Sequence, residues 1–231
     1  MQLENVNKII FIHGWLFGSY IWRSLQEYFP NTISKEFISL PGYDNISADK
    51  SRTDVIHTLL RCAKKDDVII GYSYTATTIL FSDELAKCQA SIFLVNPFLK
   101  AKSNSITALR DNLKEDFDSA VKKFIFECVK GKVSNKRHFT ILRDLFYKND
   151  VPDKDLLISE LEEMMFIDRS KLIVNSNDNL TILLSDQDEI CDAQIINKFK
   201  IKKVKILSLE NSPHFPFFDP NEIFKTIGLT S

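Results

Sequence analysis

The chain has 231 residues, which is enough for one domain with a sizeable core, with or without an insertion. Hydrophobic residues make up 44% and charged residues 26%, a composition that excludes an intrinsically disordered chain. The net charge is −1, so no overall field attracts the protein to nucleic acid or to a membrane surface. No apolar run reaches the roughly 20 residues that a membrane span requires.

The cysteines and the N-terminus indicate a cellular compartment. The four cysteines are scattered, with no C-x-x-C pair and no histidine at metal-ligand spacing. This pattern predicts free thiols in a reducing cytoplasm and no structural zinc site. The first residues, MQLENVNK, lead straight into an apolar run and lack the features of a signal peptide. We therefore expect a cytoplasmic protein that needs no metal or other cofactor.

Six short, β-branched apolar runs recur along the chain. They are Lys8–His13, Glu36–Leu40, Val68–Gly71, Ser91–Asn96, Leu180–Ser185 and Val204–Leu209. Runs that are so continuously apolar are typical of strands buried on both faces of a parallel sheet. Helical patterns separate them at Ile21–Tyr28, Arg52–Lys65 and Ala76–Leu85. The alternation predicts right-handed βαβ units and an α/β fold with about six strands, mostly or wholly parallel.

The alternation stops after the fourth strand, and from Phe98 to about Lys171 the apolar residues recur at helical spacing. The clearest helix follows Asp116 or Asp118, either of which is a suitable N-cap. We therefore predict a helical insertion before the last two strands. The expected division is a core of residues 1–97 and 176–231 and an insertion of residues 98–175.

Polar residues follow the carboxyl ends of several predicted strands, where open α/β sheets bind ligands. The third strand is followed by the turn Gly-Tyr-Ser-Tyr, which contains Ser73. The fifth leads into the acidic segment SDQDEI, and the sixth leads to His214. A serine, an acid and a histidine are therefore expected at one edge of the sheet.

These residue types are those of nucleophilic catalysis. A serine hydroxyl needs a base to take its proton and an acid to hold the imidazole in the correct tautomer. Ser73 is the candidate nucleophile and His214 the candidate base, while three aspartates compete for the role of the acid: Asp186, Asp188 and Asp192. The backbone N–H groups of Tyr74 and Trp15 are the candidate donors to an oxyanion.

Each residue also has an ordinary structural interpretation. The nucleophile-elbow pattern is Gly-x-Ser-x-Gly, and Thr75 occupies its last position here. We interpret His13 as a residue that holds its loop by hydrogen bonds, and His57 and His138 as residues of amphipathic helices. The conjunction of serine, acid and histidine favours a catalytic triad over these separate interpretations.

Four segments resemble motifs of the α/β-hydrolase superfamily, and especially of the pimeloyl-acyl carrier protein methyl ester carboxylesterases of biotin synthesis. They are FIHGW from Phe11, LPGY from Leu40, LLSDQDEI from Leu183 and SPHFPFFDPNEIF from Ser212. The resemblance implies the α/β-hydrolase fold and selects Asp188 as the acid. Thr75 and Ser185 replace two glycines of the family.

The likeness continues into the insertion, where LKEDFDSAVKKFIFECVKGK from Leu113 is similar to the lid helix of those esterases. The resemblance implies a substrate site formed by Trp15, Phe124, Ile125, Cys128 and His214. It also implies that basic lid residues contact the acidic carrier protein, here Lys122, Lys123, Lys136 and Arg137. Between Ser119 and Lys148 there are eight Lys or Arg and two acidic residues, which suits such a partner.

Together these features predict a serine carboxylesterase with a helical lid. Its expected substrate is the methyl ester of pimeloyl-acyl carrier protein, and its expected partner is that carrier, with no nucleic acid or membrane. One alternative is a general short-chain carboxylesterase, thioesterase or C–C hydrolase that acts on a small free substrate. The other is a hydrolase-fold binding protein without catalysis.

Overall fold

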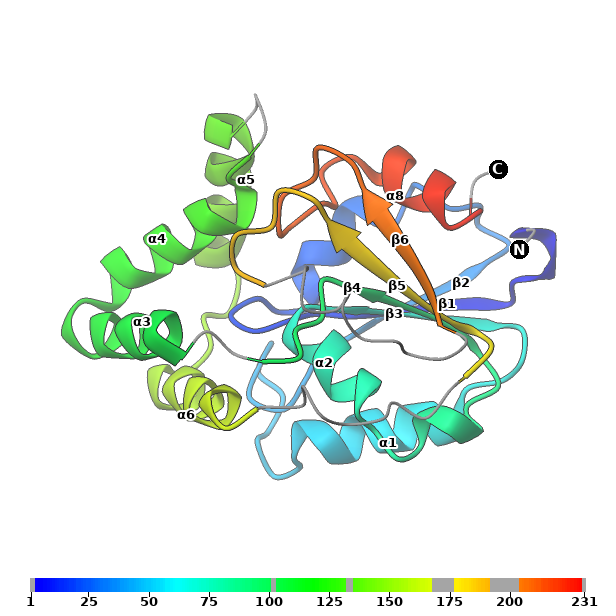
Figure 1. The fold of residues 1–231 in the computed structure, drawn as a ribbon, viewed down its shortest axis with the longest axis horizontal. Coiled ribbons are helices and arrows are strands. Elements are labelled where there is room, and N and C mark those ends of the chain that lie inside the picture. The colour runs from blue at the N-terminus through cyan, green and yellow to red at the C-terminus, as the bar shows by residue number, and fades with distance from the viewer. Residues whose placement is uncertain (1–2, 101–102, 132–134, 168–176, 192–203, 230–231) are drawn as a thin grey trace.

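The computed structural model describes residues 3–100, 103–131, 135–167, 177–191 and 204–229. Its strands form one sheet in the order β2-β1-β3-β4-β5-β6, and all neighbouring strands are parallel (Figure 1). They are β1 (Lys8–Ile12), β2 (Ser34–Ile38), β3 (Asp67–Tyr72), β4 (Ser91–Val95), β5 (Leu180–Ser185) and β6 (Lys205–Leu209). The predicted set of six parallel strands is confirmed.

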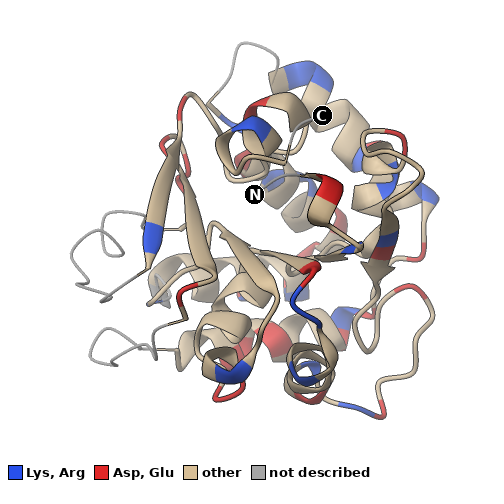
Figure 2. Cartoon of the chain, turned by 90° about the vertical axis from the view of Figure 1, so that its right-hand side faces the viewer, with Lys and Arg blue, Asp and Glu red and all other residues tan. Residues whose placement is uncertain are grey.

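The inner strands are buried on both faces because helices cover the sheet from both sides. All six residues of β3 are buried, and so are most residues of β1, β4 and β5. The edge strands β2 and β6 are partly exposed and carry charged residues (Figure 2), which are Lys35 and Glu36 on β2 and Lys205 on β6. Continuous apolar runs in the sequence therefore correspond to strands with helices on both sides.

On one face of the sheet lie α1 (Arg52–Cys62) and α2 (Tyr74–Leu80), with the 3₁₀ turn η3 (Leu85–Lys87). On the other lie η2 (Ser19–Leu25) and α8 (Pro220–Thr226), and η1 (Leu3–Asn5) precedes β1 (Figure 1). The first predicted helix is thus a 3₁₀ helix. The third predicted helix divides after Leu80, where the Ser82 hydroxyl accepts the backbone N–H of Glu84 in a local turn.

The predicted helical insertion lies between β4 and β5. Its helices are α3 (Ser103–Glu115), α4 (Phe117–Val129), α5 (Asn135–Lys148) and α6 (Lys154–Met165). They lie beyond the carboxyl ends of the strands (Figure 1), where α3 packs against α4 and α6. The Asp116 side chain caps α4 by accepting the N–H of Ser119 at 3.0 Å. The predicted boundary at residue 175 lies outside the described residues. Within the described residues, no helix is long and apolar enough to cross a membrane.

Candidate active site

Ser73 lies in a sharp turn between β3 and α2. Its φ of 54° and ψ of −118° are unfavourable for a residue with a side chain, at a cost of about 1–3 kcal/mol. The turn is held by a hydrogen bond of 2.8 Å from the Ser73 N–H to the carbonyl oxygen of Val95. This strained geometry presents the hydroxyl at the end of the strand, as in a nucleophile elbow.

The two sides of the elbow pack differently. At Gly71 a Cβ would lie 2.8 Å from Cδ1 of Ile79, so the glycine allows α2 to pack directly on β3. Thr75 is fully buried where the pattern has glycine. Its hydroxyl donates to the carbonyl oxygen of His13 at 2.6 Å and accepts from Nη1 of Arg52 at 2.8 Å. The Thr75 side chain is therefore accommodated by specific polar partners.

The structure brings Ser73, His214 and Asp188 together. His214 Nε2 lies 3.0 Å from Ser73 Oγ, and His214 Nδ1 lies 2.7 Å from Oδ2 of Asp188. Because an ionised carboxylate only accepts hydrogen bonds, Nδ1 carries the imidazole proton and Nε2 is free to accept one from the serine. The imidazole is fully buried and the Asp188 side chain is 1% exposed, so water does not compete for this pair.

Backbone groups hold the carboxylate of Asp188. Its Oδ1 accepts the N–H groups of Ile190 at 2.8 Å and Cys191 at 2.9 Å, which leaves Oδ2 facing His214. The competing Asp186 instead accepts the N–H of Ser212 at 3.0 Å and so holds the loop that leads to His214. Asp192 lies outside the described residues. Of the two described aspartates, only Asp188 contacts the imidazole.

The loop before the oxyanion candidate Trp15 is fixed by His13. The Nδ1–H of His13 donates to the Gly14 carbonyl at 2.9 Å, and its Nε2 accepts the N–H of Leu40 at 3.1 Å. Burial, aided by the nearby positive charge of Arg52, lowers the pKa of His13 to about 3, so the ring is neutral. The interpretation of His13 as a loop-holding residue is confirmed.

Both oxyanion candidates lie beside the nucleophile. A Cβ on Gly14 would lie 3.0 Å from Cβ of Ser73, so the loop that contains Trp15 runs in close contact with the serine. Tyr74 follows Ser73 and begins α2, so its N–H has no partner within that helix. In the described part of the chain, no hydrogen bond occupies either N–H group.

A cavity of about 370 Å³ opens onto Ser73 between the core and the helical insertion. Its apolar wall includes Trp15 from the core, Phe98 from the start of the insertion, and Leu109, Phe124 and Met164 from the insertion helices. The rings of Trp15 and Phe124 meet edge to face, with centroids 4.8 Å apart. The volume lies within the range of about 300–1,000 Å³ that is usual for small-molecule sites.

Three of the five predicted substrate contacts, Ile125, Cys128 and His214, are not among the residues that line the cavity. Ile125 and Cys128 are fully buried and do not line the cavity. The face of α4 that lines it carries Ala120, Lys123, Phe124 and Glu127, at the i, i+3, i+4 and i+7 positions of one helical stripe. Ile125 and Cys128 belong to the neighbouring stripe, which is turned toward the protein interior. His214 is not part of the cavity wall but contacts Ser73 behind it.

The predicted carrier-contact residues lie on α4 and α5. Lys122, Lys123, Lys136 and Arg137 are all exposed, and Lys123 borders the cavity. Within the residues that the structure describes, none of the four forms an ion pair. The nearby Lys130 does, with Glu189 at 2.6 Å and Glu127 at 3.7 Å, which lowers the net positive charge at this edge of the cavity.

Potential metal ligands also meet at the site. The ligand atoms of Asp188, Cys191 and His214 lie within 4.8 Å of one another. However, His214 Nδ1 and two backbone N–H groups already occupy the carboxylate of Asp188. A metal ion at this position would have to displace the hydrogen bond between His214 and Asp188, so the donor set fits a hydrogen-bonded triad better than a cation site.

Sequence reasoning missed two residues near the triad. Asn96 follows β4, and its amide donates to the His214 carbonyl at 2.8 Å. Arg52 begins α1, and it is buried in an ion pair with Glu160 of α6. The position of Asn96 directly after a buried strand could have indicated its role from the sequence. No local signal identifies the second, because an arginine in the first turn of an amphipathic helix resembles an ordinary surface residue.

Known proteins share both the sequence pattern and the fold. No protein-family model matches the chain. The pimeloyl-[acyl-carrier protein] methyl ester esterase of Wigglesworthia glossinidia brevipalpis is 24% identical over 173 residues, which are 70% of this chain and 67% of that protein. The enzyme of the same name from Vibrio campbellii is 22% identical over 235 aligned positions, which cover 94% and 91% of the two chains.

Solved structures match over nearly the whole chain. A bromoperoxidase from Bacillus anthracis superposes with a TM-score of 0.74 at 14% identity, covering 97% of this chain and 91% of that one. An esterase from Exiguobacterium antarcticum gives 0.73 at 15% identity, covering 96% and 90%. The chain therefore has the α/β-hydrolase fold, with distant sequence similarity to the pimeloyl-[acyl-carrier protein] methyl ester esterases.

Proposed function

We propose that this protein is a serine hydrolase that cleaves carboxylic esters with Ser73, His214 and Asp188. One observation carries the proposal: a serine hydroxyl in a strained turn lies 3.0 Å from an imidazole that is itself 2.7 Å from a buried carboxylate, beside an apolar cavity. The three side chains have the geometry that makes an alcohol nucleophilic at neutral pH.

The proposed reaction has two halves. Ser73 Oγ bonds to the ester carbonyl carbon while its proton passes to His214 Nε2. The imidazolium then gives this proton to the leaving alkoxide, and an alcohol departs from the acyl-enzyme. Water, deprotonated by His214, attacks the acyl-enzyme and releases the acid and the serine. Asp188 orients the ring and stabilises its positive charge in both halves.

The backbone N–H groups of Trp15 and Tyr74 are the proposed oxyanion donors. Their availability beside Ser73 supports this role, because donors that are already in place stabilise the tetrahedral intermediate without reorganisation. Loss of one such donor is expected to lower turnover by roughly 10²–10³-fold.

The proposed substrate is the methyl ester of pimeloyl-acyl carrier protein. Support comes from the distant relatives that carry this name and from the apolar cavity beneath the insertion, which suits an acyl chain. The exposed lysine and arginine side chains of α4 and α5 are suited to binding an acidic carrier protein. On this proposal residues 98–175 act as a lid, with Trp15 and Phe124 against the acyl chain and Lys122, Lys123, Lys136 and Arg137 against the carrier.

The test compares methyl pimeloyl-carrier protein with free monomethyl pimelate as substrates. The proposal expects the carrier-bound ester to be cleaved faster, and Ser73→Ala to abolish cleavage of both. Lys122→Glu with Lys136→Glu should raise the KM of the carrier-bound ester about tenfold and leave the free ester unchanged. The control is Lys65→Glu, a charge reversal of an exposed lysine on the loop between α1 and β3.

In a biotin auxotroph that lacks its esterase, the wild type should restore growth and Ser73→Ala should not.

Other outcomes separate the alternatives. Equal cleavage of free and carrier-bound esters, with no effect of the reversals, would indicate a general esterase of small substrates. Absence of ester cleavage and of labelling by a fluorophosphonate would overturn the catalytic role of Ser73 and leave a binding protein with this fold.

A further inference from the structure

The inner side of α6 contacts both residues whose N–H groups are the proposed oxyanion donors. The indole Nε1–H of Trp15 donates to the carbonyl oxygen of Leu157 at 3.1 Å. The phenol of Tyr74 donates to Oε2 of Glu163 at 2.9 Å. One helix of the insertion therefore holds the side chains of both candidate donor residues.

Between these two contacts, Glu160 forms a buried ion pair with Arg52. Both side chains are only 9% exposed. The Nε–H and Nη2–H groups of Arg52 donate to Oε1 of Glu160, and the Tyr43 hydroxyl donates to Oε2 at 2.5 Å. Burial, together with the Glu160 charge, raises the pKa of Tyr43 well above its ordinary value, so Tyr43 remains a donor. Both oxygens of the carboxylate are thereby occupied.

Arg52 extends this network to the loop that precedes Trp15. Its Nη1–H donates to the hydroxyl of Thr75 at 2.8 Å, and that hydroxyl donates to the His13 carbonyl at 2.6 Å. The guanidinium carbon also lies 4.5 Å from the centroid of the Tyr74 ring. A single buried cation thus contacts both residues that directly follow Ser73.

The consequence for Trp15 follows from peptide geometry. The Thr75 hydroxyl fixes the carbonyl of His13, and the His13 ring fixes the carbonyl of Gly14. In a trans peptide the C=O and the N–H point in opposite directions. Holding the Gly14 carbonyl therefore sets the direction of the Trp15 N–H, and the described peptide bonds include no cis form. A glycine at position 75 could not make the first of these bonds.

We infer that Arg52 and Glu160 are positioning residues, through which α6 holds the oxyanion donors in place by way of Thr75. This inference rests on the proposed function of Ser73 and its two donors. It implies that the site has its full catalytic power only when α6 is seated on the core, because movement of α6 would release Trp15, Tyr74 and Arg52 together.

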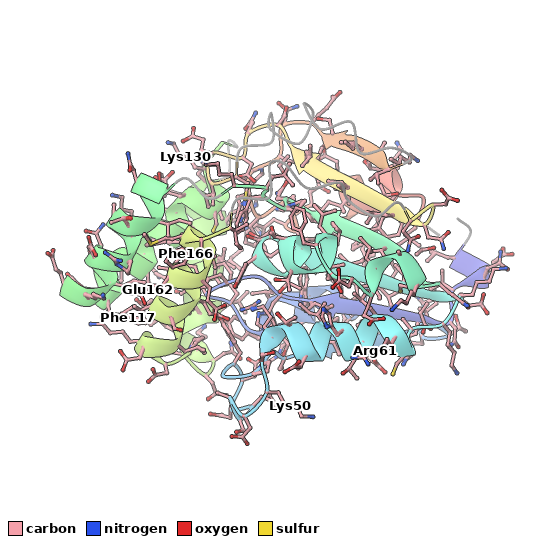
Figure 3. All side chains as sticks on the ribbon, turned by 60° about the horizontal axis from the view of Figure 1, so that its bottom comes forward. Lys50, Arg61, Phe117, Lys130, Glu162 and Phe166 are labelled. Carbon is pink, nitrogen blue, oxygen red and sulfur yellow. The ribbon has the colours of Figure 1, made fainter. Side chains whose placement is uncertain are left out.

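The test separates positioning from stability. Thr75→Val removes the hydroxyl at nearly constant volume, and Thr75→Ser keeps it. Arg52→Leu with Glu160→Leu removes both buried charges, an exchange that is often neutral for folding. The matched control is Glu162→Gln on the same helix, a residue with a half-exposed side chain (Figure 3). Among the described residues, its ion pairs are the long ones to Arg110 at 3.9 Å and Lys114 at 3.7 Å. The readouts are the kcat and KM for a p-nitrophenyl ester and the melting temperature.

We expect kcat to fall about 10- to 100-fold in Thr75→Val and in the double variant, with little change in KM, because the donors remain but are misplaced. Thr75→Ser should recover most of the loss, and Glu162→Gln should match the wild type. Wild-type kcat in Thr75→Val, or in a double variant that melts like the wild type, would overturn the inference. If the double variant does not fold, the comparison of Thr75→Val with Thr75→Ser tests the inference.

Amide hydrogen exchange provides a readout that does not depend on activity. In Thr75→Val, a peptide that covers residues 13–18 should exchange faster than in the wild type and in Glu162→Gln. If the wild type cleaves no ester and is not labelled by a fluorophosphonate, the proposed function fails, and faster exchange would still support the positioning network. If the wild type is active and neither kcat nor exchange changes, the positioning inference alone fails.

Discussion

Asn96 and Ser185 exchange two hydrogen bonds across the carboxyl ends of β4 and β5. The Asn96 amide donates to the Ser185 hydroxyl at 2.9 Å, and the Ser185 N–H donates to the Asn96 side-chain oxygen at 2.8 Å. The same amide also donates to the His214 carbonyl, so Asn96 connects the strand that leads to Asp188 with the loop that carries His214. The hydroxyl of Ser185 takes part in this connection.

Asn96→Ala should therefore destabilise the protein. The change removes three buried hydrogen bonds and leaves the N–H of Ser185 without its partner, and the φ of 51° at this position also disfavours alanine. We expect the free energy of unfolding to fall by roughly 2–4 kcal/mol in urea denaturation. Asn179→Ala, which removes an exposed hydrogen bond to Gln89, is the control. A loss equal to that of the control would contradict this role of Asn96.

Asp188→Asn and Asp186→Asn should separate the two described acids. An amide at position 188 can donate to Nδ1 and would favour the wrong imidazole tautomer, so kcat should fall by roughly 10⁴-fold. Asp186 contacts the N–H of Ser212 and not the imidazole, so its variant should retain most of the activity. The kcat of both variants on one p-nitrophenyl ester is the measurement, and similar losses in the two would contradict the assignment of Asp188.

Folding stability should depend on pH through His13. In the folded protein its pKa is lowered from 6.5 to about 3, chiefly by burial, so the folded state binds no proton on His13 where the unfolded state does. The contribution of His13 to the free energy of unfolding is therefore fully present above about pH 6.5. It declines as the pH falls toward 3, by at most about 1.4 kcal/mol per pH unit.

Between about pH 5 and 6.5 carboxylates contribute little to the pH dependence of stability, because they titrate mainly below this range. Urea unfolding at several pH values should show a smaller slope in His13→Asn than in the wild type. Asn179→Ala, which changes an exposed residue that does not titrate, should keep the wild-type slope. Equal slopes in all three proteins would show that His13 does not account for the acid sensitivity.

The cavity should determine how long an acyl chain the enzyme accepts. Leu109→Trp places a larger ring in the cavity wall that α3 contributes. We expect kcat/KM for p-nitrophenyl octanoate to fall at least about tenfold relative to the acetate, because the longer chain needs the space that the ring fills. Ile141→Trp, an exposed position on α5 outside the cavity, should leave the ratio unchanged. An equal loss for both esters in Leu109→Trp would mean that the acyl chain does not enter here.

The sequence by itself predicted the fold because its signals are local. Runs such as Ile9–Ile12 and Ile92–Val95 are apolar at every position, which is typical of a strand covered on both faces. The helical spacing after Phe98 identified the insertion. Ser73 and His214 could be singled out because parallel strands bring their carboxyl ends to one edge of the sheet. On the residues alone, the choice among the three aspartates stayed open.

Which side chains meet depends on the packing of distant segments, which the sequence pattern does not specify. Asp186 and Asp188 are two residues apart, and the path of the loop alone directs one to His214 and the other to Ser212. The rotation of α4 about its axis placed Phe124 at the cavity and turned Cys128 away from it. Arg52 and Glu160 are 108 residues apart, and the sequence around each is that of an ordinary helix, which does not indicate their ion pair. Periodicity specifies the exposed and buried faces of an element, whereas a contact between distant elements depends on how those faces pack together.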